Sequence, residues 1–233
     1  MSQTANTDLG RELAPATAQE RKAFQDHAFQ VLSSRFQGTL DAADRWGLTV
    51  VLPSERLREA VVFLRDSDDF RLDLLLDITA VDYLGYPGHD EARFAVVYNL
   101  RSQRAAGRRL RLKVRVEEET PKVPSIHDLY RIANWQERET WDQYGIVFEG
   151  HPDLRRLLNH IEFQGHPLRK DYPARKRQWL SSNDPLVAPM VARLKSNGFT
   201  VLENPTPNAP SVEETGLLGK VSREQRNNVE NPS

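Results

Sequence analysis

The sequence predicts an α+β fold: a two-layer sandwich with a mixed sheet of four to five strands, helices on one side, and an extended C-terminal arm. One strand–helix–strand unit is followed by consecutive strands, which places parallel and antiparallel pairs in one sheet. The last 53 residues, 181–233, hold a single aromatic residue, Phe199, and six of the fourteen prolines. That composition buries little apolar surface, so it predicts an arm rather than a second core.

The first helix is predicted by the signal at its N-terminus. Thr17-Ala-Gln-Glu20 has the spacing of a capping box, in which each end of the motif satisfies a backbone N–H of the other. Phe24, Ala28 and Val31 follow at helical spacing and give the helix one apolar face. Residues 1–16 before it are predicted to form a flexible N-terminal tail.

The sheet is predicted from four apolar segments: 48–52, 72–79, 94–100 and 109–116. Between the first two, Pro53 and Ser54 begin a helix whose inward positions are Leu57, Ala60, Val61 and Leu64. The fourth segment alternates strictly, so one face is apolar and the other carries Arg109, Arg111, Lys113 and Arg115. A solvated sheet face is the ordinary interpretation of this stripe, and a contact for an acidic partner is the alternative.

Short helices and turns follow the sheet. Ser125-Ile-His-Asp128 is predicted to start one short helix, and Asn134-Trp-Gln-Glu137 a second that Gly145 terminates. We therefore divide the chain into an α+β domain over 17–145, an extended partner-binding segment over 146–180, and a C-terminal extension over 181–233. Within the extension, 184–198 is predicted to form one helix. The residues from Glu203 onward are predicted to be disordered or to order on a partner.

A five-residue turn occurs twice in the extended segment. Phe148-Glu-Gly-His-Pro152 returns fifteen residues later as Phe163-Gln-Gly-His-Pro167. In each copy the phenylalanine can anchor, the glycine permits positive φ, and the proline keeps the histidine out of the helical region. The sequence predicts two stiff turns, each with an imidazole beside it.

Histidines in such turns raise the possibility of a metal or a catalytic site. His151, His160 and His166, with Glu162, are suitable ligands for zinc or non-haem iron, and a free-standing metallohydrolase is one alternative. The chain has no cysteine, and the sequence contains no His-x-x-x-His pair, nucleophile elbow, GxGxxG or Walker loop. We therefore predict no catalytic, cofactor-binding or metal-binding residue in this chain.

Composition excludes further classes. The 32 basic and 33 acidic residues give a formal net charge of −1, whereas a general nucleic-acid binder is usually far more basic. No window approaches the roughly 18 apolar residues of a membrane span, and the N-terminus lacks a secretory pattern.

Charge also divides along the chain: 117–149 is acidic and 151–180 is basic. Arginines of the basic half are the type that forms bidentate contacts to carboxylates at interfaces.

These motifs together resemble a known family. Glu137-Arg-Glu139, Asp142, Gly145 and the two turns with their basic continuations, to Arg156 and to Pro173, are similar to the signature of the C subunit of bacterial NADH–quinone oxidoreductase (respiratory complex I, NDH-1). The resemblance covers roughly residues 20–180, and a match of this length is far more specific than a single short motif. Asn159-His-Ile-Glu162 departs from the family pattern.

The resemblance implies a role as well as a fold. It implies a non-catalytic structural or assembly subunit of the hydrophilic arm of a proton-translocating enzyme that passes electrons from NADH through FMN and iron–sulfur clusters to quinone. The enzyme activity belongs to the complex, and this chain holds no cofactor. The implied partners are chiefly the D and B subunits, with no nucleic acid, and the implied location is peripheral, on the cytoplasmic side of the inner membrane. The equivalent subunit of a related hydrogenase, or of a ferredoxin- or coenzyme-linked quinone reductase, is the alternative.

On this interpretation the charged and histidine residues of the motifs fasten the chain to a partner. The predicted partner-binding residues are Glu137, Arg138, Glu139, Asp142, His151, Asp153, Arg155, Arg156, His166, Arg169, Lys170 and Asp171. If the arginines pair with carboxylates of another subunit, Arg156→Ala or Arg169→Ala leaves the isolated chain folded and weakens assembly.

Overall fold

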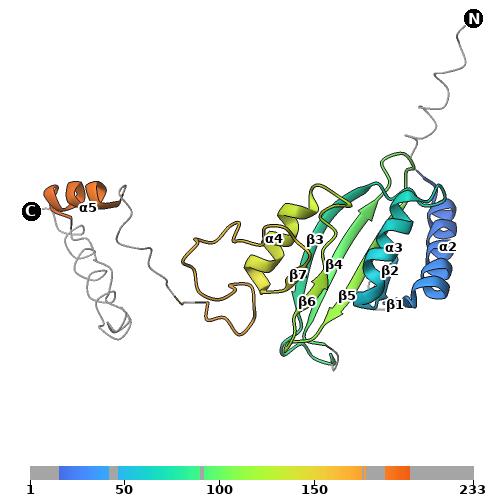
Figure 1. The fold of residues 1–233 in the computed structure, drawn as a ribbon, viewed down its shortest axis with the longest axis horizontal. Coiled ribbons are helices and arrows are strands. Elements are labelled where there is room, and N and C mark those ends of the chain that lie inside the picture. Colours follow the sequence, from blue (N-terminus) through green and yellow to red (C-terminus); the bar gives the residue numbers. More distant parts are fainter. Residues whose placement is uncertain (1–15, 42–46, 90–91, 175, 177–186, 200–233) are drawn as a thin grey trace, which may run out of the picture. The chain divides into compact units, whose positions relative to one another are not determined.

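The computed structural model describes residues 16–41, 47–89, 92–174, 176 and 187–199. They fall into two compact units, divided after Lys176. The first unit holds the sheet and most of the helices (Figure 1). The second has one described element, helix α5 (Val187–Ser196), which lies within the helix predicted over 184–198. The expectations for the tail before Ala16 and for residues beyond Glu203 lie outside the described residues.

The first unit is built on a five-stranded mixed sheet with the strand order β1-β2-β5-β4-β3, which confirms the predicted fold class. Its strands are β1 (Thr39–Leu40), β2 (Thr49–Leu52), β3 (Leu74–Asp82), β4 (Phe94–Arg101) and β5 (Arg109–Val116). Strands β2 and β5 pair in parallel and the other neighbours are antiparallel. A separate parallel pair joins β6 (Lys122–Pro124) to β7 (Val147–Glu149).

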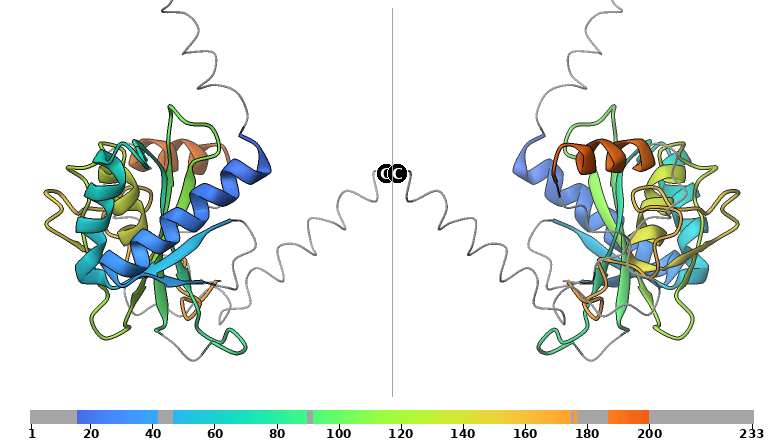
Figure 2. Two further views of the ribbon diagram at one scale, coloured as in Figure 1. Left: turned by 90° about the vertical axis from the view of Figure 1, so that its right-hand side faces the viewer. Right: turned by 90° about the vertical axis from the view of Figure 1, so that its left-hand side faces the viewer.

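Helices α2 (Ala18–Phe36) and α3 (Ser54–Asp66) lie beside each other against the sheet (Figure 2). The capping box of α2 is present in both directions, with Thr17 accepting from Glu20 N and Glu20 accepting from Thr17 N. The left-handed residue that ends α2 is Gln37, with φ of 59°. In α3 the buried positions are the four that periodicity predicts: Leu57, Ala60, Val61 and Leu64.

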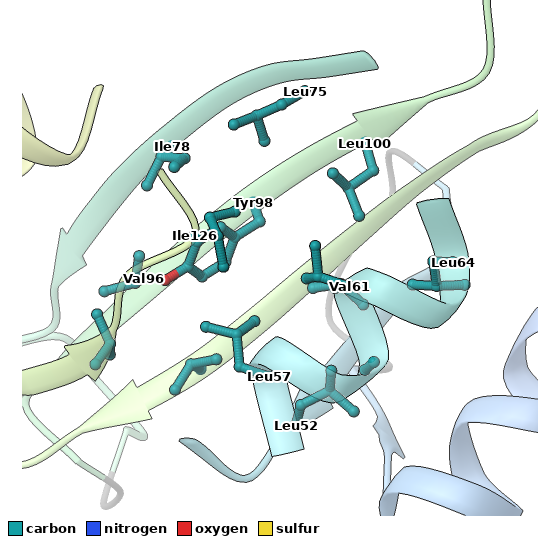
Figure 3. Close-up of a cluster of buried hydrophobic side chains, with 14 of the residues drawn as sticks. Leu52, Leu57, Val61, Leu64, Leu75, Ile78, Val96, Tyr98, Leu100 and Ile126 are labelled. Carbon is teal, nitrogen blue, oxygen red and sulfur yellow. The ribbon is translucent and has the colours of Figure 1, made fainter. Parts of the chain in front are cut away.

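The core lies between α3 and the central strands. Figure 3 shows Leu57, Val61 and Leu64 facing side chains of β4 and β3. Tyr98 and Leu100 of β4 and Ile78 of β3 are each no more than 3% exposed. Each fully buried side chain of this size contributes about 1.5–3 kcal/mol relative to an exposed one.

Helix α4 (Ala133–Tyr144) covers the outer edge of the sheet. Strand β3 is an end strand of the sheet, so part of its backbone has no neighbouring strand to bond. Gln136 Nε2 donates to Leu76 O at 3.0 Å, and Thr140 Oγ1 donates to Ile78 O at 3.1 Å. One face of α4 therefore satisfies carbonyls that another strand would otherwise take.

The helix predicted to start at Ser125 does not form. Residues 126–130 make a single turn, in which Leu129 N and Tyr130 N both donate to Ile126 O. The Ser125 hydroxyl, expected as a helix cap, donates instead to Glu137 of α4. Tyr130 OH donates to Leu72 O at 2.6 Å, which holds the turn against the sheet. Tertiary contacts at both ends of this segment thus replace the local bonds that a longer helix would make.

Candidate functional site

The candidate site is helix α4 together with the chain that wraps it, residues 147–172. The helix begins at Ala133, one residue before the predicted start, and ends as predicted at Gly145, whose φ is 76°. Its buried residues are mostly polar or charged: Ala133, Glu137, Arg138, Thr140 and Asp142. A buried charge must be paired or hydrogen-bonded, so the partners of these side chains define the site.

Asp142 is the centre of the wrapped segment. Its side chain is fully buried and accepts backbone N–H bonds from Leu157, Leu158 and Asn159 at 2.9–3.1 Å. Arg156 Nη1 lies 2.6 Å from Asp142 Oδ1. Burial opposes ionisation, but these hydrogen bonds outweigh it and lower the pKa of Asp142 to about 2.

Arg156 links the second copy of the repeated turn to α4. Its side chain is 13% exposed, and Nη2 donates to Gly165 O at 2.9 Å, at the glycine of the second turn. The guanidinium also lies over the rings of Trp141 and Phe163, at 5.7 and 5.4 Å from their centroids. The carboxylate that Arg156 pairs with thus belongs to its own chain, so the expectation that Arg156→Ala leaves the isolated chain unaffected does not fit this geometry.

Glu137 joins α4 to the turn after β6. It is fully buried and accepts from the Ser125 hydroxyl and from Ile126 N, the latter at 2.7 Å. Burial raises the pKa of Glu137 to about 7, although both hydrogen bonds favour the carboxylate. Glu137 therefore connects α4 to the turn after β6 within this chain.

The first turn lies along the N-terminal half of α4. His151 Nε2 is 3.1 Å from Asn134 O, and His151 Nδ1 accepts from Asp153 N at 3.1 Å. Burial lowers the pKa of His151. Arg138 donates to the carbonyls of Arg155 and Arg156 at 3.1 and 3.2 Å. The predicted turn is present, with Gly150 at φ of 85°.

The second turn covers the C-terminal end of the same helix. His166 Nδ1 lies 3.1 Å from Asp142 O, Leu168 N donates to Gln143 O at 3.1 Å, and Arg169 Nε donates to Tyr144 O at 2.5 Å. These are carbonyls that the last turn of a helix leaves without an internal partner. A cation at this end also complements the helix dipole. Burial lowers the pKa of His166.

Gly145 is the position where this packing requires glycine. A Cβ there would lie 2.6 Å from both Arg169 Nη2 and His166 Nε2, and the φ of 76° disfavours any other residue. The close approach of the second turn to α4 therefore depends on one missing side chain.

Residues after the second turn reach the sheet through Arg93. Arg93 Nη2 lies 3.0 Å from Asp82 and 2.9 Å from Asp171, and a further terminal nitrogen pairs with Glu118. Lys170 contributes its backbone N–H, which donates to Asp82 Oδ2 at 2.9 Å. Arg93 and Asp82 were not among the predicted site residues. The sequence signal that could have identified them is their position, because Asp82 ends β3 and Arg93 directly precedes β4.

The predicted site residues therefore divide into two groups. Glu137, Arg138, Asp142, His151, Arg156, His166 and Arg169 use their side chains within the chain. Glu139, Asp153, Arg155, Lys170 and Asp171 are exposed, although the Asp171 carboxylate also pairs with Arg93. Asp153 and Arg155 form a surface ion pair at 2.9 Å. On the same side of α4 as Glu139, Ile132 and Trp135 are 46% and 55% exposed.

The imidazoles of His151 and His166 make hydrogen bonds that stabilise the wrapped segment. The hydrogen-bond partners of His151 and His166 named above are backbone atoms. Within the described ranges, no group of three histidine, cysteine, aspartate or glutamate side chains is placed to hold a metal ion. None of the helices in that part of the chain has the length and apolar character needed to cross a bilayer.

The fold and site define an α+β module in which buried polar groups fasten the wrapped segment to helix α4. The chain belongs to the family of the 30 kDa subunit of respiratory-chain NADH dehydrogenase, whose model matches residues 50–178. The match includes the sheet from β2 onward, α4 and both turns.

Relatives agree with this family. The C subunit of NADH-quinone oxidoreductase from Methylobacterium sp. (strain 4-46) is 49% identical over 154 residues, 63% of this chain and 68% of the relative. The C subunit of the same enzyme from Caulobacter sp. (strain K31) is 48% identical over 126 residues, 54% of this chain and 56% of the relative. NADH-quinone oxidoreductase subunit 5 of Thermus thermophilus is 47% identical over 130 residues, 54% of this chain and 61% of the relative.

Among solved structures, a trypsin-resistant fragment of Nqo5 is 37% identical with a TM-score of 0.50, covering 56% of this chain and 99% of the fragment. A chain of the archaeal membrane-bound sulfane sulfur reductase has a TM-score of 0.51 at 21% identity, covering 81% of this chain and 98% of its own length, which shows a shared fold.

Proposed function

We propose that this chain is a non-catalytic structural subunit of the hydrophilic arm of a proton-translocating NADH–quinone oxidoreductase. Family membership supports this role, as do relatives at 45–49% identity that are named as the C subunit of that enzyme. Electron transfer from NADH through flavin and iron–sulfur clusters to quinone then belongs to the assembled complex. This chain contributes no cofactor.

The observation that carries the non-catalytic role is the internal use of the ionisable side chains. A general base must reach a proton on the substrate at about 2.6–3.2 Å. Asp142 already accepts the N–H groups of Leu157, Leu158 and Asn159 and pairs with Arg156. Glu137 lies inside the fold. These groups fix the shape of the wrapped segment.

The exposed members of the site are the proposed partner contacts. Glu139, Asp153, Arg155, Lys170 and Asp171 would face the neighbouring subunits, which the family assignment suggests are chiefly the D and B subunits. Trp135 fits the same role, because exposed tryptophan beside arginine is typical of interface hot spots. The chain then lies peripherally on the cytoplasmic side of the inner membrane, held there by the complex.

Affinity purification of the tagged full chain from its own cells tests this proposal. We expect a flavin-binding NADH-oxidising subunit and the D and B subunits among the chains that co-purify. Recovery with hydrogenase subunits in place of the NADH-oxidising subunit would instead support the related-reductase alternative.

A double variant separates a structural contact from a catalytic one. In Trp135→Ala with Arg155→Ala, we expect less assembled complex but unchanged NADH–quinone turnover per assembled complex. The matched control is Arg56→Ala with Lys22→Ala, two exposed cations on α3 and α2. Full assembly with lost turnover would contradict the structural role.

A further inference from the structure

We infer that the face of the sheet turned away from α2 and α3 is a second interaction surface, which docks an acidic protein surface of a neighbouring subunit. The inference rests on the proposed function, because it requires an assembled complex. It concerns a surface on the opposite side of the strands from the core, separate from the wrapped segment around α4.

Strand register aligns polar residues across this face. Thr49, Arg111, Asn99 and Asp77 lie side by side on β2, β5, β4 and β3. Val51, Lys113, Val97 and Thr79 form the next row in the same order. Because side chains alternate between the faces of a strand, both rows point away from the buried Leu110, Leu112 and Val114.

The face carries a concentrated positive charge. Its basic residues are Arg101, Arg109, Arg111, Lys113 and Arg115, of which Arg101, Arg109 and Arg115 are exposed. Within the part of the chain that the structure describes, the acidic residues that the strand register or an ion pair places among them are Asp77 and Asp41, and Asp41 pairs with Lys113 at 2.6 Å. Since the whole chain has a formal net charge of −1, this excess of cations is a local property of the face. It favours a partner of opposite charge.

The face is also shaped for contact. The small apolar residues of this face are already buried, with Ala95 1%, Val97 8% and Val51 7% exposed, so a partner would meet the cationic side chains at the neighbouring positions. At one end a shallow groove is lined by Thr49, Asp77, Asn99, Arg109 and Arg111. Arg111 Nε donates to Asn99 Oδ1 at 2.9 Å, which orients its guanidinium. Arg109, Arg111 and Arg115 each also take part in a further interaction within the chain.

Other occupants fit less well. A second copy bound by two-fold symmetry would place the same cations against each other. Single-stranded nucleic acid needs aromatic rings on which bases stack. The aromatic ring that reaches this face beside Lys113 is Tyr83, and it is already stacked on His89 at 3.8 Å. An acidic protein surface requires only the exposed cations.

Charge reversal in the assembled complex tests the surface. The variant Arg109→Glu with Arg115→Glu is compared with Lys22→Glu with Arg56→Glu, which makes the same charge change at exposed positions on the helical layer. We expect the amount of chain retained in the purified complex to fall about tenfold or more for the sheet variant alone. Equal retention of both variants would overturn the inference.

A charge-preserving variant keeps the test valid if the reversed chain does not fold. In Arg109→Lys with Arg115→Lys the complex is treated with a carbodiimide, which joins an amine to a carboxylate in direct contact. We expect cross-links from the lysines introduced at these two positions to aspartate or glutamate of another subunit. Cross-links confined to this chain would count against the surface.

Two further outcomes separate the alternatives. If the wild-type chain co-purifies with no oxidoreductase subunit, the proposed function fails, and the surface fails with it. If the wild type co-purifies and the sheet variant is retained like its control, only the surface is wrong. Arginine-dependent binding of the full chain to phosphatidylserine vesicles or to single-stranded DNA, without cross-links to another polypeptide, would replace the acidic protein with an anionic lipid or nucleic acid.

Discussion

Helices α3 and α4 are nearly equal in length, at 13 and 12 residues, but are held in place by different forces. The buried positions of α3 are all apolar, from Leu57 to Leu64. Those of α4 include Glu137, Arg138 and Asp142, and their partners include carbonyl groups, N–H groups, a hydroxyl group and a guanidinium. Burial of apolar area is non-directional, whereas a buried polar contact is strong only with correct geometry.

The difference predicts how each helix tolerates change. Removing an apolar side chain from α3 leaves a cavity, and its cost depends on how far the surroundings relax. Removing a polar partner in α4 leaves a charge or an N–H buried without a bond. The wrapped segment is thus more sensitive to single substitutions and to pH than the core.

Asp142→Ala should have the largest effect. The change leaves the largely buried guanidinium of Arg156 without its carboxylate and takes the acceptor from three backbone N–H groups. We expect a loss of about 3–5 kcal/mol in the free energy of unfolding, measured by urea denaturation of the full chain. Arg156→Ala should cost a comparable amount, and the double variant should cost less than the sum of the two. Glu139→Ala, exposed on the same helix, is the control, and equal stability of Asp142→Ala and Glu139→Ala would refute the fastening role.

Leu57→Ala tests the other helix. Leu57 is fully buried in the core, so we expect a loss of about 2–5 kcal/mol in the free energy of unfolding. No ionisable group is involved in this contact, so the loss should be the same at about pH 5 and about pH 8. A strongly pH-dependent loss would contradict the claim that α3, unlike α4, is held by apolar contacts alone.

Glu137→Gln tests the pH dependence of α4. The pKa of Glu137 is raised by burial from 4.5 to about 7. The stability this group contributes is therefore fully present below pH 4.5 and is lost as the pH rises through about 7. The stability of the wild type relative to the glutamine variant should fall by up to about 3 kcal/mol between these limits. Urea denaturation at about pH 4.5 and about pH 8 measures this, with Glu139→Gln as control, and a constant difference would show that Glu137 titrates normally.

Arg155→Ala should have the smallest effect on the isolated chain. Its ion pair with Asp153 is exposed on both sides, and such pairs contribute about 0–1 kcal/mol. The neighbouring Arg156 side chain is 13% exposed and pairs with the fully buried Asp142, so the two adjacent arginines compare an exposed with a largely buried ion pair directly. Equal losses for Arg155→Ala and Arg156→Ala would mean that burial does not distinguish them.

Much of the fold could be predicted from the sequence because apolar periodicity is local. The inward positions of α3, the capping box at Thr17 and the terminator Gly145 are each specified by residues a few positions apart. Strand β3 was predicted to begin at Leu72, two residues early, because Leu72 is apolar and buried but does not pair in the sheet.

The site could be predicted only in part, because the partner of a charge is a non-local property. The charged residues around α4 were identified, but the carboxylates that pair with the arginines were expected on another subunit. Asp142 and Arg156 are 14 positions apart, and Lys170 meets Asp82 across 88 positions. The acidic half beside a basic half of the chain is equally compatible with pairing inside the chain. No pattern along the sequence distinguishes the two.

The covering of the β3 edge by α4 has a consequence for folding during synthesis of the protein. Strand β3 ends at Asp82, and the helix that satisfies Leu76 O and Ile78 O begins about 50 residues later, at Ala133. At synthesis rates of roughly 5–20 residues per second, strand β3 waits about 2.5–10 s for its cover. During that interval the nascent chain presents an open strand edge of nine residues. Such an edge can pair with another nascent chain on the same polysome, so slow translation of residues 83–132 should increase aggregation during synthesis.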